Sequence, residues 1–88
     1  MKPRARSTRR EVRNPVPALP EARHILDIPP PERAILADLL RDLAIDAAAR
    51  AQDAWRRHKA PMAVYWKACS VYARHLERVL RGPQWARG

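Results

Sequence analysis

The sequence of 88 residues contains little glycine, one cysteine and no phenylalanine. Glycine occurs only at Gly82 and Gly88, which excludes a glycine-rich phosphate-binding loop. A lone Cys69 cannot form an intramolecular disulfide, so nothing indicates an oxidising compartment. No apolar run approaches the roughly 18 to 20 residues that cross a bilayer, and no apolar segment follows the basic start. We therefore expect a cytoplasmic protein with no membrane partner.

The residues needed for catalysis or metal binding are also scarce. His24, His58 and His75 show no ligand spacing with one another or with Cys69. Cys69 falls on a predicted core stripe, where a thiol behaves as an inert small hydrophobe. The paired acids that the sequence does contain are predicted to be exposed, without the burial that tunes a general acid. The sequence predicts no enzyme, no metal and no cofactor.

What the sequence has is an excess of positive charge and enough apolar residues to fold. There are 18 Lys and Arg against 9 Asp and Glu, and the net charge of +9 attracts polyanions. All but three of the cations are arginine, whose planar fork suits phosphate groups. A chain this short allows one domain and buries only about 60% of its unfolded surface, so help from a partner is plausible.

Composition divides the chain into four segments. Residues 1–13 carry six cations and one acid, and we expect them to form a disordered basic arm. Residues 14–30 alternate proline with apolar residues, which favours an extended strap with a possible short helix from Pro20 to Ile28. Residues 31–82 are predicted to form a helical hairpin, and residues 83–88 a tail.

The hairpin is predicted from proline positions and from apolar periodicity. Pro31 and Pro61 suit the first positions of two helices, over residues 31–59 and 61–81. A connection of a few residues makes the helices antiparallel. The expected fold class is therefore all-α: an antiparallel two-helix hairpin preceded by a strap and a basic arm.

Side-chain sizes predict which faces of the two helices meet. The first helix has a stripe of Leu36, Leu39, Leu40, Leu43, Ala47, Ala51 and Ala54, and the second has Tyr65, Cys69, Tyr72, Leu76 and Val79. If opposed positions have numbers that sum to about 121, the alanines face the two tyrosines and Cys69, and the leucines face Leu76, Val79 and Leu80. We expect this pairing of small with large residues to form the seam.

The second helix is apolar over more of its circumference than one neighbour can cover. Val64, Trp66 and Val71 flank its stripe, and we expect them to be the partner interface. The missing cover could come from the strap, from a second copy that completes a four-helix bundle, or from another protein.

Three groups of cations are candidates for contact with phosphate. The nucleic-acid-binding residues that we predict lie in the arm, at the hairpin tip beside Trp55, and on the back of the second helix: Arg4, Arg6, Arg9, Arg10, Arg13, Arg56, Arg57, Lys59, Lys67, Arg74, Arg78 and Arg81. The group on the second helix is expected to face away from the first helix. The alternative for each group is an ordinary solvated surface.

One side of the first helix is acidic and carries Asp38, Asp42, Asp46 and Asp53. A polyanion would repel this side, so we expect the opposite, basic side of the molecule to face it. Much of the acidic charge on that side is expected to be paired locally, for example Asp53 with Arg57. The leading hypothesis from the sequence is a non-enzymatic protein that binds DNA or RNA through phosphates. The alternative hypothesis is a small protein-interaction module: an adaptor, an inhibitor, or a subunit of a larger assembly, including a homodimer.

Overall fold

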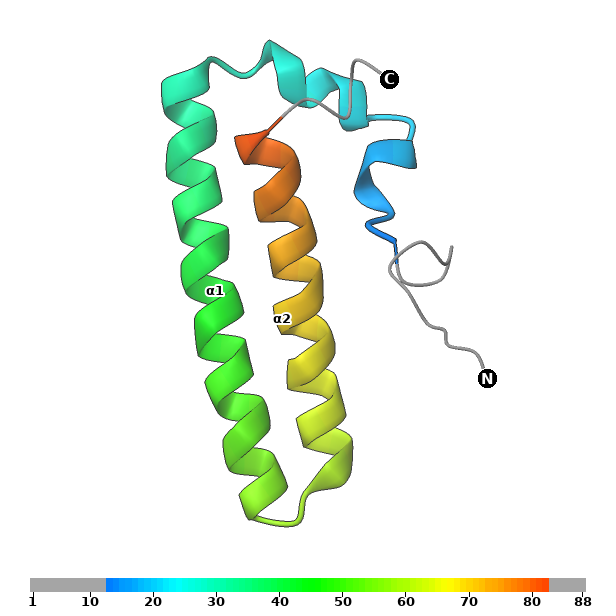
Figure 1. Ribbon diagram of the computed structural model, residues 1–88, viewed down its shortest axis with the longest axis vertical. Coiled ribbons are helices and arrows are strands. Elements are labelled where there is room, and N and C mark those ends of the chain that lie inside the picture. The colour runs from blue at the N-terminus through cyan, green and yellow to red at the C-terminus, as the bar shows by residue number, and fades with distance from the viewer. Residues whose placement is uncertain (1–12, 83–88) are drawn as a thin grey trace, which may run out of the picture.

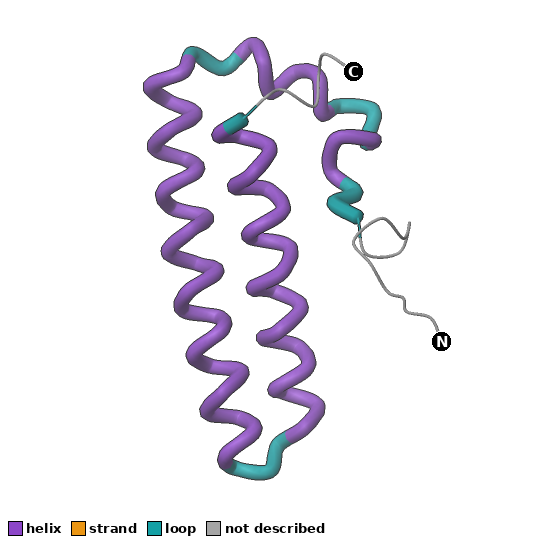
Figure 2. Tube along the Cα trace, viewed as in Figure 1, coloured by secondary structure: helices purple, strands orange, loops and turns teal. Residues whose placement is uncertain are grey.

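Two antiparallel helices form the body of the protein, α1 from Pro30 to Arg56 and α2 from Ala60 to Arg81 (Figure 1). The computed structural model describes residues 13–82, and Figure 2 shows helices joined by loops throughout this range, with no strand. The expected all-α helical hairpin is confirmed. Both helices carry a proline within their first two residues, where the missing N–H costs nothing.

The turn between the helices covers residues 57–59 and is longer than the single residue left by the expected helices. α1 begins one residue earlier and ends three residues earlier than expected, and α2 begins one residue earlier. His58 has a positive φ of 59°, and the N–H groups of His58 and Lys59 donate to the carbonyls of Trp55 and Ala54. This pattern of hydrogen bonds is a Schellman motif, in which histidine takes the place usually held by glycine.

A strap runs from the start of α1 across the C-terminal end of α2 and along its far side (Figure 1). It contains two 3₁₀ helices, η2 (Val16–Ala18) and η3 (Ala22–Asp27), where the sequence predicted one possible short helix. Each contributes one buried apolar residue, Val16 and Ala22. Asn14 Nδ2 donates to the carbonyl of His75 at 2.9 Å and fastens one end of the strap to α2.

The seam between the helices consists mainly of small residues. α1 contributes five buried alanines and α2 contributes Ala63, Ser70, Ala73 and Leu80. Ser70 Oγ donates to the carbonyl of Ala44 at 2.9 Å, which satisfies a buried hydroxyl between the two backbones. Small residues on both helices let the backbones approach closely.

The expected pairing of small with large residues in this seam is wrong. Tyr65 is 60% exposed and Tyr72 is 57% exposed, and Leu76 is exposed as well. The alanines of α1 are buried as predicted, but they lie against Ala63, Ser70 and Ala73. Small residues of both helices pack closely in the seam, in the place where the tyrosines were expected. The tyrosines lie outside the seam, where their hydroxyls keep access to water.

The register of the hairpin also differs from the expectation. Ser70 hydrogen-bonds to Ala44, where the expected register would have placed Ala51. Leu36, Leu39 and Leu43 remain exposed, while Val79 and Leu80 are the large residues of the second helix that are buried. The hairpin therefore leaves much of its apolar surface outside its own core.

Candidate interaction surfaces

Residues seven apart are about two full turns apart and therefore lie on nearly the same side of a helix. A series of residues spaced by seven thus forms a line along one side, and such lines identify the sides of the hairpin. On α1 one line contains Leu36, Leu43, Arg50 and Arg57, and on α2 another contains Met62, Cys69 and Leu76. Near the turn, a shallow pocket is lined by members of both lines, Arg50, Arg57 and Met62. The two lines therefore lie on the same side of the hairpin.

That side, which we call the apolar side, carries large residues from both helices. Each of its members is between 38% and 63% exposed: Leu36, Leu39, Leu43, Met62, Tyr65, Tyr72 and Leu76. The strap packs elsewhere, against the part of α2 that contains His75 and the buried Val79. An apolar group of this extent is typical of a surface that another molecule covers.

The charges at the edge of the apolar side are of both signs and pair locally. Arg50 Nε lies 2.7 Å from Asp46 Oδ2, and Arg57 Nε lies 3.0 Å from Asp53 Oδ2. These i, i+4 pairs confirm the local pairing expected for Asp53 and Arg57. The Arg50 guanidinium also sits 4.9 Å from the ring centroid of Trp66, a cation–π contact.

Tyr65 and Cys69 lie one turn apart on the apolar side. A hydrogen bond with the Cys69 side chain raises the pKa of the Tyr65 phenol above its usual value, and the charge that Cys69 can acquire acts in the same direction.

Of the three residues predicted as the partner interface, only Trp66 lies beside this side, since Val64 and Val71 follow the seven-residue line of Arg78. Val64 and Val71 are exposed on the outer flank of α2, whereas Trp66 is half-buried under Arg50. Leu36, Leu39 and Leu43, and the tyrosines assigned to the core, were missed as surface residues. These surface residues could have been recognised if the alanines of α1 had been matched with Ala63, Ser70 and Ala73 on α2.

The opposite side of the hairpin is basic. Lys67, Arg74 and Arg81 follow a seven-residue line on α2, and Arg74 lines a shallow cleft with Arg41, Ala44, Ile45 and Glu77. We call the group Arg41, Lys67, Arg74, Arg78 and Arg81 the basic side. The antiparallel register brings in Arg41, which sequence reasoning did not select.

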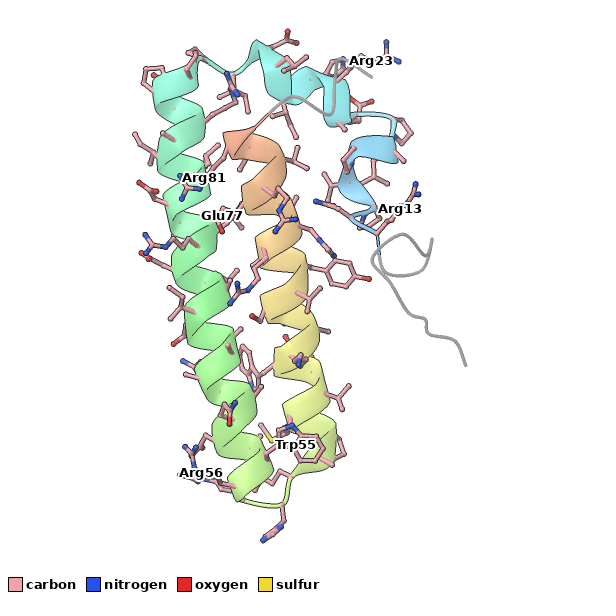
Figure 3. The ribbon with its side chains drawn as sticks, viewed as in Figure 1. Arg13, Arg23, Trp55, Arg56, Glu77 and Arg81 are labelled. Atoms are coloured by element: carbon pink, nitrogen blue, oxygen red, sulfur yellow. The ribbon has the colours of Figure 1, made fainter. Side chains whose placement is uncertain are left out.

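The expectation that the α2 cations face away from the first helix is wrong for Arg81. Its Nη2 lies 2.8 Å from Asp38 Oδ1 on α1, and its Nε lies 2.7 Å from Glu77 Oε2. Figure 3 shows Arg81 and Glu77 together where α2 faces α1. Hydrogen bonds with Asp38 and then Glu77 raise the pKa of Arg81, and the two acids neutralise much of its charge.

Three other cations of the basic side keep their charge available. Lys67, Arg74 and Arg78 are exposed, and no acidic group within residues 13–82 forms an ion pair with them. Arg74 and Arg78 line one shallow pocket together with Glu77, Arg81 and Gly82.

The predicted cations outside α2 are distributed differently. At the tip, Asp53 pairs with Arg56 at 3.5 Å as well as with Arg57, while Lys59 lines the pocket beside Trp66. Trp55 is 57% exposed but does not line that pocket. Arg13 is exposed at the start of the strap (Figure 3), and Arg4, Arg6, Arg9 and Arg10 lie outside the described residues.

Residues 13–82 contain no group of three or more His, Cys, Asp or Glu side chains that could hold a metal ion. Within the same range, neither long helix combines the length and apolar character needed to span a membrane. The chain matches no protein-family model, no curated protein and no solved structure.

Proposed function

We propose that the protein is a helical protein-interaction module that binds through its apolar side. The observation that supports this proposal is the exposure of Tyr65, Tyr72 and Leu76, together with Leu36, Leu39 and Leu43, on one side of a hairpin whose seam is already filled by alanines. Val64 and Val71 are exposed too, but they follow the seven-residue line of Arg78 and do not belong to this surface.

Energetics favour a covered surface. Burying a large apolar side chain completely contributes about 1.5 to 3 kcal/mol, so leaving seven of them half-exposed forfeits much of what a small domain has available. The hairpin is too thin to bury them itself, since two helices share a single seam. A partner that covers the apolar side would supply this missing stabilisation. The cytoplasmic location expected from the sequence stays a prediction.

Affinity purification from the native host cells, with and without nuclease, tests the proposal. We expect co-purifying protein that resists nuclease, is lost with Leu43→Glu, and is kept with Ile45→Glu. Ile45 is the matched control because it is 54% exposed, compared with 44% for Leu43, but lies on the basic side. Proteins that disappear with nuclease in every variant would contradict a direct protein partner.

A second candidate function is binding of nucleic acid through the phosphate backbone, and the basic side favours it. Lys67, Arg74 and Arg78 are exposed without acidic partners in the described residues, and Arg41 lies across the cleft from Arg74. Cations from two helices would then release counterions from one phosphate backbone. The sequence adds the Arg-rich residues 1–13 to this charge.

Gel-shift titration over a range of salt concentrations tests this second function. We expect binding to DNA or RNA whose affinity falls steeply with salt, and a slope that decreases when Arg74 and Arg78 are both changed to Gln. The control is Arg50→Gln together with Arg57→Gln, which removes the same charge from the edge of the apolar side. Equal effects of the two double variants would show that net charge, and not the basic side, determines binding.

A further inference from the structure

We infer that the apolar side binds a second copy of this chain, so that two hairpins form a four-helix bundle. The inference rests on the proposed function and names the partner of the same surface. Three features of the molecule support it: the area of the surface, the levels of its residues along the helices, and the distribution of charge.

The rest of the chain does not supply a matching cover. The strap is already fastened to the far side of α2, through Asn14 and through η2 with its buried Val16. Residues 1–12 and 83–88 contain three large apolar residues, Met1, Val12 and Trp85, which is too few to match seven exposed ones. No segment of these 88 residues therefore supplies the cover.

The area of the apolar side suits a stable dimer. Seven side chains, each about half exposed, present about 600 Å² if a large side chain offers about 150 to 200 Å². A standard interface buries about 800 Å² on each partner, of which roughly 60% is apolar, so about 500 Å² of apolar surface is needed. The apolar side meets this requirement without help from the strap.

The levels of the apolar residues along the helices make the surface self-complementary. The hydrogen bond between Ser70 and Ala44 places these two residues at the same height along the helix axes. Counting along each helix from this pair, Tyr72 lies within about one residue of the height of Leu43. In the same way, Leu76 lies within about one residue of the height of Leu39. A two-fold axis parallel to the helices preserves these levels. It places Leu43 of one copy opposite Tyr72 of the second copy, and Leu39 opposite Leu76.

The same axis makes every neighbouring pair of helices antiparallel. α1 of one copy then packs against α2 of the other, as in an up-down-up-down bundle. Nearer the turn, Arg50 comes opposite Tyr65 of the second copy, where a guanidinium can rest on an aromatic ring.

The distribution of charge permits this contact despite a net charge of +9 on each copy. At the edge of the apolar side Arg50 and Arg57 are paired with Asp46 and Asp53. Lys67, Arg74 and Arg78, which form no ion pair within residues 13–82, lie on the basic side, and Lys59 lies beside the turn. Two copies that meet through their apolar sides therefore keep their basic sides apart and directed outward.

Sedimentation equilibrium of the full chain, after nuclease treatment and at high salt, tests the inference. We expect twice the chain mass of 10.1 kDa, a dissociation constant weakened about 100-fold or more by Leu43→Glu because both copies carry the change, and little effect of Ile45→Glu. Circular dichroism checks that each variant keeps its helix. If Leu43→Glu unfolds, Tyr72→Glu replaces it, because Tyr72 is already largely exposed.

A wild-type protein that stays monomeric at every soluble concentration overturns the inference, and so does a dimer that Leu43→Glu and Ile45→Glu weaken equally. The proposed function has a separate outcome. If the monomer still captures a nuclease-resistant partner that Leu43→Glu loses and Ile45→Glu keeps, the function stands and the occupant is a different protein. If a monomer captures no such partner, both are wrong.

Discussion

At the scale of single residues, the contact between Tyr65 and Cys69 links an exposed phenol to the only cysteine in the chain. The hydrogen bond favours the neutral phenol in the folded protein, so the pKa of Tyr65 is raised above its unfolded value. The stability from this contact is therefore complete below the ordinary tyrosine pKa. It is lost as the pH rises through the higher pKa of the folded state.

We predict that Cys69→Ala moves the pKa of Tyr65 back toward that of an ordinary tyrosine, because the principal cause of the shift is removed. Ultraviolet absorbance of the phenolate during an alkaline titration measures this change. Tyr65→Phe is the control, since the titration phase that disappears in this variant belongs to Tyr65. If Cys69→Ala leaves the phase of Tyr65 where it was, the contact does not exist in solution.

Ser70 shows at the same scale what composition does not reveal. Its hydroxyl is buried and bonded to the carbonyl of Ala44, so it marks the face of α2 that meets α1. In the sequence Ser70 lies between apolar residues, and neither its polarity nor its spacing from the aromatic stripe indicated a buried position. A buried serine needs a nearby acceptor, and that acceptor is known only once the second helix is in place.

At the scale of elements, the three-residue turn after α1 has a left-handed conformation at His58, with φ of 59°. A residue with a Cβ pays about 1 to 2 kcal/mol in that region, whereas glycine does not. We predict that His58→Gly raises the free energy of unfolding by about 0.5 to 1 kcal/mol, after allowance for the greater freedom of glycine in the unfolded chain. Urea denaturation measures the change.

Lys59→Gly is the matched control for the turn. Lys59 has a negative φ of −111°, so glycine relieves no strain there and should only lower stability. If both glycine variants are destabilised alike, the left-handed turn is not present in solution.

The small-residue seam gives a prediction for α2. Ala73 is 3% exposed and faces the alanines of α1, so Ala73→Leu must push the helices apart. We predict a loss of about 1 to 3 kcal/mol in the free energy of unfolding, measured by urea denaturation. Ala68→Leu adds the same volume at an exposed position of α2 and should change stability little. A neutral Ala73→Leu would show that the helices do not approach closely.

The two helices, their antiparallel arrangement and the strap could be predicted from the sequence because their signals are local. Prolines mark the helix starts, and apolar spacing marks the helical period. The rotation of α2 about its axis could not be predicted in the same way. α2 carries two candidate faces, one large and apolar with Tyr65 and Tyr72, the other small with Ala63 and Ala73. Hydrophobicity favours the first, but close packing against the alanines of α1 selects the second.

The candidate surfaces follow from that rotation. Placing Tyr72 outside the seam creates the apolar side, and it turns Arg81 toward Asp38 instead of away from α1. Val64 and Val71 could be recognised as surface residues because they lie outside either face. Arg41 could not be recognised, because its place beside Arg74 depends on the register of the hairpin.

At the scale of the whole molecule, the strap is the one described element besides the hairpin that covers apolar surface, and polar bonds at both of its ends hold it. Asn14 donates to the carbonyl of His75, and its Oδ1 accepts from the N–H of Val16 at 3.0 Å. At the other end, Arg33 donates to the carbonyls of Ile28 and Leu80, at 3.0 and 3.3 Å. Between them Val16 and Ala22 are buried, so the strap extends the core beyond the seam.

Asn14→Ala should release the strap without opening the hairpin. We predict faster hydrogen exchange at the amide of Val16, whose acceptor is removed, with little change at the seam amides of Ala47 and Ala51. Stability should fall by about 1 kcal/mol, the usual contribution of such hydrogen bonds. Asn14→Asp separates the two bonds, since it keeps the acceptor for Val16 and loses the donor to His75.

Arg23→Ala is the control for the strap, because Arg23 points away from the hairpin (Figure 3). Its exchange rates should match those of the wild type. If Asn14→Ala instead speeds exchange equally in the strap and at Ala47 and Ala51, the strap and the hairpin unfold as one unit. The apolar side would then depend on the strap for its shape, although the strap does not cover it.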